Sequence, residues 1–237
     1  MSNIDQYWQT GFHVVEGWVD QRLLPFLKCI AAVQSERNVI GNIAEIGVHH
    51  GRFLIALAHL ARPGETCVAI DLFDSQELNI DGSGTGSVDR VRQNLASYGP
   101  PNAPVVFIKA DTLALSLADR VEIVRQHGPF RMFSVDGGHT AEHVVNDLLF
   151  AQDALSSGGV VLADDYYHRH WPGVTEGICR FFAHHSPRLK PFLFVHNKLF
   201  LANASWHPYY LHMIREVFHD EAEFKLVHMH GSAAVAI

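Results

Sequence analysis

The segment NIAEIGVHHG at residues 42–51 joins a short apolar strand to a glycine-containing turn. Apolar residues then recur at helical spacing through residues 51–61, so the pattern predicts a strand, a turn and a helix in succession. The turn has the form Gly47-x-x-x-Gly51. It lacks the Gly-x-Gly-x-x-Gly spacing that lets a pyrophosphate approach a helix N-terminus, which disfavours a Rossmann dehydrogenase.

The same alternation continues along the chain on both sides of this segment. Strands are expected at 42–47, 67–71, 105–109, 131–136, 160–164, 192–195, 199–202 and 224–229. Helices are expected at 14–35, 51–61, 87–98, 115–127, 174–184 and 208–218, and from the N-cap Thr140 to Gly158-Gly159. Strands that alternate with helices predict a doubly wound, mostly parallel α/β sheet covered on both faces. The last apolar pair, around residues 196–198, predicts a C-terminal antiparallel hairpin.

Length and composition indicate a single folded domain without a nucleic-acid surface. The 237 residues are 48% hydrophobic and 18% charged, which is an ordinary globular balance. The formal net charge is −7, and the 18 Lys and Arg residues form no basic run, so a nucleic-acid partner is not expected. We expect one domain over 1–237, with an N-terminal helical extension (1–40), a core (41–202) and a C-terminal extension (203–237).

The cysteines and the chain start predict a cytoplasmic protein. Cys29, Cys67 and Cys179 are far apart and form no CxxC pair, so neither a zinc knuckle nor a disulfide framework is expected. No secretory signal or bilayer-spanning apolar run is visible, and no membrane partner is expected. Two-fold dimers are the commonest assemblies, which makes a homodimer the expected one.

Acidic residues follow five consecutive strands of the predicted sheet. They are Glu45, Asp71, Asp111, Asp136 and the pair Asp164-Asp165. Acids favour turns and helix N-termini, but that preference accounts for only one or two of them. Ligands of such sheets bind beyond the carboxyl ends of the strands. Carboxylates would repel the phosphates of a dinucleotide, whereas they suit the sulfonium, ammonium and ribose hydroxyls of S-adenosylmethionine.

The pattern Glu45-x-Gly47-x-x-x-Gly51, followed by Asp71 and Asp111, resembles the class I S-adenosylmethionine-dependent methyltransferases over residues 40–202. The resemblance implies a Rossmann-like, seven-stranded sheet whose last strand is antiparallel, and S-adenosylmethionine as the cofactor. It implies that Glu45, Gly47 and Gly51 bind the methionine part. It also implies that Asp71 binds the ribose and that Asp111 lies near the adenine.

A narrower resemblance is to metal-dependent O-methyltransferases that act on sugars of macrolides and aminocoumarins. Those enzymes carry a metal-binding Asp after the fourth strand and an acidic pair after the fifth, which Asp136, Asp164 and Asp165 match. Some carry a histidine three residues after the first ligand as general base, and His139 matches it. The resemblance implies methylation of a hydroxyl on a small molecule, first a sugar or glycosylated natural product and second a catechol-like diol.

This chemistry is coherent without the family. Three carboxylates form a hard oxygen site suited to magnesium, manganese or calcium, with magnesium expected first. A bound metal can lower the pKa of an oxygen acid such as water from about 15.7 to about 7. Asp136 would hold the metal at the reacting oxygen, and His139 could then accept the proton.

Other interpretations of the same residues remain. Asp136 could have no role beyond capping a helix, Asp164-Asp165 could be a solvated turn, and Glu45 could be paired in the core. His139 to His143 reads H-x-x-E-H, the inverted zinc-protease motif of a zinc hydrolase. The preceding Asp-Gly-Gly places His139 in the turn before the helix, which disfavours it. A hydroxylase-like relative, or a non-catalytic protein that binds adenosylmethionine, also stays open because a fold does not fix a reaction.

Overall fold

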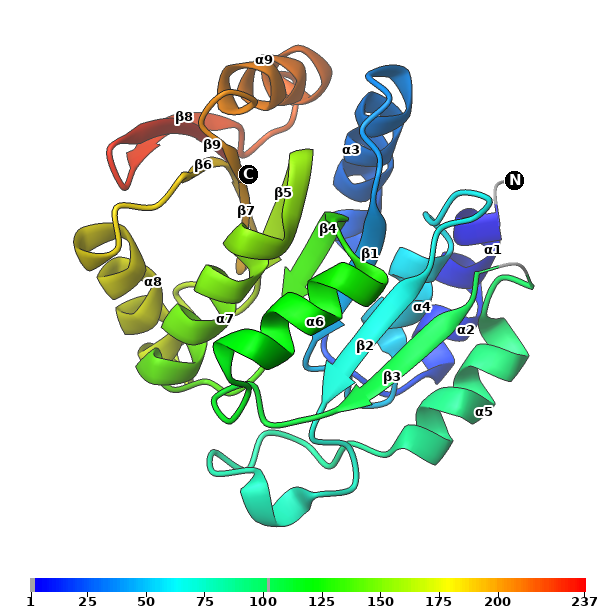
Figure 1. The fold of residues 1–237 in the computed structure, drawn as a ribbon. Coiled ribbons are helices and arrows are strands. Elements are labelled where there is room, and N and C mark those ends of the chain that lie inside the picture. Colours follow the sequence, from blue (N-terminus) through cyan, green and yellow to red (C-terminus); the bar gives the residue numbers. More distant parts are fainter. Residues whose placement is uncertain (1–2, 102) are drawn as a thin grey trace.

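The computed structural model describes residues 3–101 and 103–237, and helices alternate with strands along most of this length (Figure 1). The strands are β1 (Asn42–Ile46), β2 (Cys67–Asp71), β3 (Val105–Lys109), β4 (Phe130–Val135), β5 (Leu155–Ala163), β6 (Leu189–Val195), β7 (Lys198–Asn203), β8 (Lys225–Met229) and β9 (Ser232–Ala236). The α-helices are α1 (Asn3–Gln9), α2 (Gly11–Val14), α3 (Leu24–Glu36), α4 (Arg52–Ala58), α5 (Val88–Tyr98), α6 (Leu117–His127), α7 (Ala141–Ala154), α8 (Pro172–His184) and α9 (His207–Phe218). Two short 3₁₀ helices are η1 (Gln21–Leu23) and η2 (Gln76–Leu78).

The strands form a single sheet in the order β3-β2-β1-β4-β5-β7-β6-β9-β8. The first five strands are parallel, and β7 runs antiparallel to both β5 and β6. Within the described residues the sheet therefore has nine strands, and the expected number of seven is wrong. After β8 the chain turns at His230 and Gly231, both with positive φ, and β9 returns to pair with β8 and with β6. The doubly wound class and the antiparallel C-terminal hairpin β6–β7 are confirmed.

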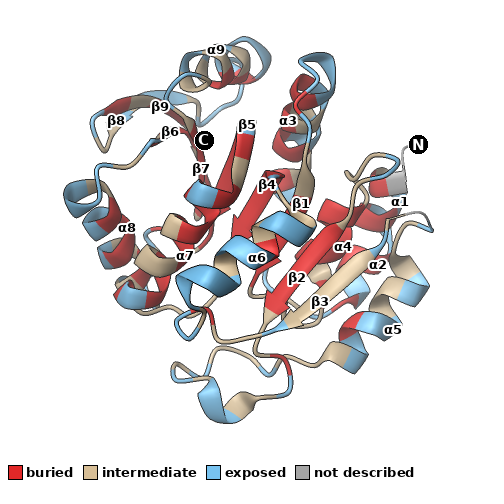
Figure 2. Cartoon of the chain, viewed as in Figure 1, coloured by how far each residue is buried: buried red, intermediate tan, exposed pale blue. Residues whose placement is uncertain are grey.

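Helices cover both faces of the sheet. Alternate strand residues point to opposite sides, so Val160 packs in a core with α1 to α5 and α9, while Val161 packs in a core with α6, α7 and α8. Figure 2 shows the consequence: the central strands are buried, whereas the outer faces of the helices are exposed. The strand order reverses at β1, which is the position where ligands bind in such sheets.

The predicted helix over 14–35 is wrong in its first part. Helix α2 ends at Val14, the chain then runs irregularly to Asp20, and α3 begins only at Leu24. Gly17 has a φ of 154°, and its carbonyl accepts a hydrogen bond from the guanidinium of Arg52. This contact draws the segment 15–20 across the start of α4, beside the glycine turn.

The boundary between α7 and β5 also differs from the prediction. Thr140 caps α7 as expected, since its side chain accepts from the backbone N–H of His143. The helix, however, ends at Ala154, and Gly158-Gly159 lies inside the strand. Gly158 has a φ of 80°, and a Cβ there would lie 2.7 Å from Val39 and 2.9 Å from Trp206. A close approach explains the glycine within a strand.

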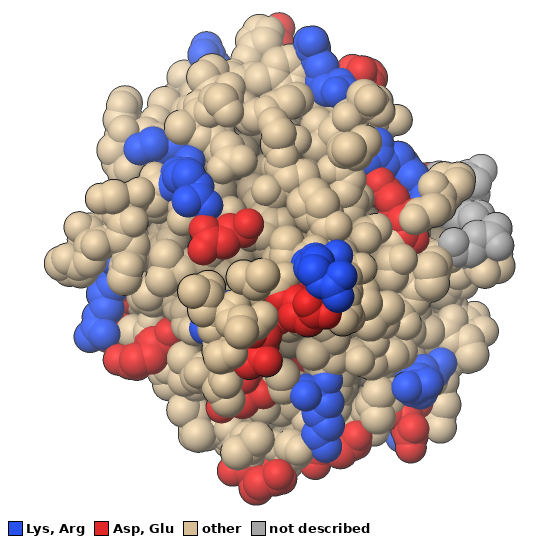
Figure 3. Space-filling model, in the orientation of Figure 1, with Lys and Arg blue, Asp and Glu red and all other residues tan. Residues whose placement is uncertain are grey.

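On the face drawn in Figure 3, Lys and Arg side chains are scattered, whereas Asp and Glu lie mostly in the lower half of the view. Arg125 pairs with Glu122 at 2.6 Å. Among the helices of residues 3–101 and 103–237, none combines the length and apolar character needed to cross a bilayer.

Candidate active site

A cavity of about 670 Å³ opens at the carboxyl ends of β1, β2, β4 and β5. This volume lies within the range of about 300–1,000 Å³ that is typical of small-molecule sites. The segment 18–20 and the loop between β2 and α5 complete its wall. That loop projects beyond the strand ends at the bottom of Figure 1.

The turn after β1 requires glycine at its first position. Gly47 has a φ of 81°, and a Cβ there would lie 1.6 Å from the carbonyl oxygen of Asp136. No side chain fits this space, so the loops after β1 and β4 can approach each other only at glycine. Gly51, with a φ of 87°, is the N-cap residue of α4.

Asp71 braces this turn from the end of β2. Its Oδ2 accepts hydrogen bonds from the backbone N–H groups of Val48 (2.5 Å) and His49 (2.9 Å), and its Oδ1 accepts from that of Phe73 (2.5 Å). The carboxylate also borders the cavity. It therefore holds the turn after β1 in shape, and its contact with a ribose stays a prediction.

The other expected cofactor residues lie at different depths. Gly47 and Asp111 border the cavity, whereas Glu45 and Gly51 are not among the described residues that line it. Glu45 is 1% exposed, and burial raises the pKa of its carboxyl well above the ordinary value. Within residues 3–101 and 103–237, its Oε2 has no hydrogen-bond partner. Glu45 thus lies behind the cavity wall, and its contact with the cofactor remains a prediction.

The acids after β4 and β5 meet at the cavity together with His139. Ligand atoms of Asp136, His139 and Asp165 all lie within 4.8 Å of one another. Burial and the adjacent carboxylate of Asp164 raise the pKa of Asp136 well above its ordinary value. A buried carboxyl beside a second carboxylate holds its proton more tightly than one in water, because burial and like charge both disfavour the ionised form.

Asp164 is engaged by a buried lysine. Nζ of Lys198 donates to Oδ2 of Asp164 at 2.5 Å, and Oδ1 of Asp164 accepts from the backbone N–H of Asp165 at 2.9 Å. Lys198 is 1% exposed; burial lowers its pKa, but Asp164 and Asp136 outweigh burial and raise it. The three expected metal ligands thus share one site, but Asp164 is already ion-paired.

His139 is held in one orientation from three sides. Nδ1 donates to Oδ2 of Asp81 at 2.9 Å, Nε2 donates to Oδ2 of Asp165 at 3.1 Å, and Trp171 stacks on the ring with centroids 4.2 Å apart. Burial lowers the pKa of His139, but the hydrogen bonds with Asp165 and Asp81 outweigh burial and raise it to about 9. The backbone N–H of His139 also donates to Asp81, at 2.7 Å.

Two important residues of this site were missed by sequence reasoning. Lys198 carried a signal, since antiparallel pairing of Ala163 with Leu199 places it next to Asp164. A single lysine at the start of the otherwise apolar run 199–202 could have been recognised as its partner. Asp81 lies in the loop between β2 and α5, and no local pattern indicates that it returns to His139.

The H-x-x-E-H motif does not assemble as a zinc site in the described part of the chain. His139 precedes α7 and faces Asp81 and Asp165. Nδ1 of His143 forms a hydrogen bond with the Thr140 hydroxyl at 2.7 Å, and the exposed Glu142 pairs with Arg180 at 3.2 Å. The three side chains of the motif therefore have separate partners.

A doubly wound sheet with an antiparallel β7, a glycine turn after β1, an acid after β2 and a cavity at the switch point is the arrangement expected of a class I methyltransferase. Residues 44–166, just over half of the chain, match the family described as methyltransferase domain. The chain belongs to this family. It is an S-adenosylmethionine-dependent methyltransferase, as the resemblance implied.

Solved structures show the same fold at low sequence identity. The O-methyltransferase NovP is 19% identical, with 77% of this chain and 79% of that chain covered and a TM-score of 0.56. An O-methyltransferase from Bacillus cereus in complex with SAH is 17% identical, with 85% and 90% covered and a TM-score of 0.54. MycE from the mycinamycin biosynthetic pathway, in complex with Mg, SAH and mycinamycin VI, is 17% identical with a TM-score of 0.56. The match to MycE covers 85% of this chain but only 54% of MycE. A comparison with curated proteins finds no match.

Proposed function

We propose that the protein transfers the methyl group of S-adenosylmethionine to a hydroxyl oxygen of a small molecule, with a divalent cation, magnesium first, held by Asp136 and Asp165. The observation that carries this proposal is the convergence of Asp136, His139 and Asp165 at a cavity that Gly47 in the turn after β1 also borders. A methyl donor at that turn and an acceptor at the acids would share one space.

The donor set fits a hard cation. Magnesium is usually held by one or two carboxylates and completes its shell with water or substrate oxygens. Asp136 and Asp165 offer two carboxylates, and burial together with the neighbouring Asp164 raises the pKa of Asp136, so a cation there would favour its ionised form. Asp164 could join only by giving up its ion pair with Lys198, so we assign it to hold Asp165 in place through the backbone N–H of that residue.

The bound cation would lower the pKa of an acceptor hydroxyl and orient its oxygen. Nε2 of His139 takes the hydroxyl proton, while Asp81 holds Nδ1 and the backbone N–H and Trp171 fixes the ring plane. The oxygen forms its bond to the methyl carbon as the carbon–sulfur bond breaks. His139 must be neutral for this step. Without a cation, Asp165 stabilises the imidazolium form of His139. A cation bound at Asp165 would cancel this effect and favour the neutral ring.

The rim of the cavity indicates an acceptor with an apolar portion. Trp18, Leu78 and Ile80 line it and are 70%, 46% and 70% exposed. Exposed apolar side chains around a polar site mark a binding surface. NovP, an O-methyltransferase, and MycE, whose structure is a complex with mycinamycin VI, share this fold. A sugar or glycosylated natural product is therefore the first acceptor to screen, and a catechol-like diol the second.

Calorimetric titration of the purified, metal-stripped protein tests this proposal. We expect wild-type protein to bind S-adenosylmethionine and, in its presence, one magnesium ion. Asp136→Asn and Asp165→Asn should lose magnesium binding while keeping the cofactor, because neither side chain belongs to the glycine turn.

Asp153→Asn is the matched control, since Asp153 is an exposed acid paired with Arg188 on the surface. It should bind both ligands as wild type does. Magnesium binding that persists in Asp136→Asn and Asp165→Asn would contradict the metal assignment. Absence of cofactor binding by folded wild-type protein would contradict the whole proposal.

A further inference from the structure

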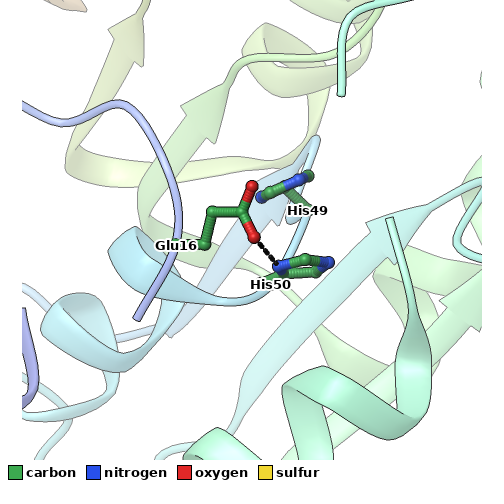
Figure 4. Close-up of side chains that lie close together, drawn as sticks. All are labelled: Glu16, His49 and His50. Carbon is green, nitrogen blue, oxygen red and sulfur yellow. Dashed lines mark ion pairs between the residues drawn. The ribbon is translucent and has the colours of Figure 1, made fainter. Parts of the chain in front are cut away.

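A second cluster of potential ligands lies at the turn after β1 and includes two of its residues. Figure 4 shows Glu16, from the segment before η1, directed at His49 and His50 in the turn after β1. One carboxylate oxygen and one nitrogen from each imidazole lie within 4.8 Å of one another. Neither Glu16 nor His50 has a role in the methyl transfer proposed above.

The contacts of His50 leave two acceptors face to face. Nε2 of His50 lies 3.0 Å from the carbonyl oxygen of Thr85 and donates to it. In a neutral ring, Nδ1 then carries a lone pair, and this atom lies 3.2 Å from Oε2 of Glu16. A proton or a metal ion must lie between two such groups.

His49 favours the metal ion. Its ring stacks on that of His50 with centroids 3.9 Å apart and also interacts with the backbone of Glu16. Its buried Nδ1 has no side-chain hydrogen-bond partner in the described part of the chain. A proton on His50 would satisfy Glu16 but leave this nitrogen without a side-chain partner. A cation can engage all three side chains together.

We propose that Glu16, His49 and His50 form a binding site for a zinc-class divalent cation. Two imidazoles and one carboxylate, with water in the fourth position, are a common tetrahedral zinc set. Ligands about 2.0–2.1 Å from zinc lie about 3.4 Å from one another, and Glu16 and His50 already have that spacing. The carbonyl of Thr85 supplies the outer hydrogen bond that a metal-binding histidine usually makes.

This site is chemically distinct from the acidic one. The imidazoles suit zinc, cobalt and nickel, whereas the carboxylates of Asp136 and Asp165 suit magnesium. A bound cation would tie the segment 15–20 to the turn that Asp71 braces. Trp18 belongs to this segment and contacts His49, with ring centroids 4.9 Å apart, so the same link would hold one wall of the cavity.

Cobalt titration of the full-length, metal-stripped protein tests the site. Cobalt(II) has intense visible bands when four-coordinate and weak ones when six-coordinate, and excess magnesium keeps the acidic site occupied. We expect saturable, intense absorption at one equivalent and its loss on addition of zinc. His50→Ala should abolish it, and Glu16→Ala should weaken cobalt binding about tenfold or more, as loss of a metal-site group does.

His13→Ala is the matched control, because His13 is an exposed histidine close to Glu16 in sequence, and its titration should equal that of wild type. Circular dichroism checks that each variant is folded, and Glu16, 68% exposed, can be removed without opening the core. Intense absorption that survives in His50→Ala, or that disappears in Asp165→Asn, would overturn the proposal. So would the absence of saturable four-coordinate absorption in wild type.

Discussion

Lys198 is the residue on which the charge balance of the active site depends most. Its ammonium lies 2.5 Å from Asp164 and 4.7 Å from the centre of the Phe53 ring, and the side chain is 1% exposed. Buried charges of one sign need a partner, because the interior replaces little of the hydration they lose. Asp164 has this lysine as its cation, which explains why an acid 6% exposed is tolerated.

Replacing Lys198 with methionine should therefore destabilise the fold. Lys198→Met keeps the volume but leaves Asp164 buried without its cation, and removing one partner of a buried pair costs about 3–5 kcal/mol. Urea unfolding at pH 7 measures this change in free energy of unfolding. The exposed Lys225→Met should stay close to wild type, and Lys198→Met/Asp164→Leu should recover much of the loss. A single variant as stable as wild type would contradict this account.

At the scale of elements, a buried arginine joins strand, helix and loop. Arg131 on β4 donates to Glu65 in the loop before β2 at 2.8 Å, to Gln34 on α3 at 2.7 Å and to the carbonyl of Leu60 at 2.7 Å. Burial alone would raise the pKa of Glu65, but hydrogen bonds from Arg131 and Arg62 outweigh it and hold that pKa below its ordinary value of 4.5.

Glu65→Gln should destabilise the protein in a pH-dependent way. Because the folded pKa of Glu65 is lowered, its ionisation stabilises the fold above pH 4.5 and this contribution is lost as pH falls through the folded pKa. We expect a loss of about 2 kcal/mol at pH 7, between the values for buried and exposed pairs. The difference from wild type should shrink below pH 4.5.

Unfolding curves measured from pH 7 to pH 3 provide this test. Glu122→Gln is the control, since Glu122 forms a similar pair with Arg125 but on the exposed surface of α6. Its curve should follow that of wild type throughout. A Glu65→Gln deficit that stays constant as the pH falls would show that the charge of Glu65 is not the cause.

At the scale of the whole molecule, the β8–β9 hairpin closes one end of the sheet. Strand β9 pairs with β6 through Leu193–Val235 and Phe194–Ala236, and Ala234 and Val235 are fully buried. Without this hairpin, β6 would become an edge strand with free backbone groups and an uncovered apolar face.

Deletion of residues 224–237 should therefore produce self-association. The exposed edge and apolar face of β6 would pair with other copies, so size-exclusion chromatography with light scattering should show larger species than the intact chain forms. Leu226→Ser is the control, because Leu226 is 50% exposed on β8, and it should elute as wild type does. A truncated chain that elutes as the intact one does would contradict this role.

The local sequence pattern was sufficient to predict most of the fold and to select the acidic residues that lie at the strand ends. Five strands, each followed by a turn and a helix, are visible because apolar spacing changes within a few residues. Asp71, Asp136 and Asp165 could be placed at one edge because parallel strands end at the same side of a sheet. The glycine at position 47 followed from the same local reasoning.

Tertiary structure decided how those residues are used, because their partners lie far away in sequence. The pairing of Lys198 with Asp164 depends on the antiparallel register of β7 on β5, and the contact of Asp81 with His139 depends on the path of a loop without periodic pattern. The ninth strand and the position of Glu16 beside His50 likewise follow from long-range packing. Sequence spacing specifies which side chains one element presents, whereas charge pairing and ligand geometry depend on which elements meet.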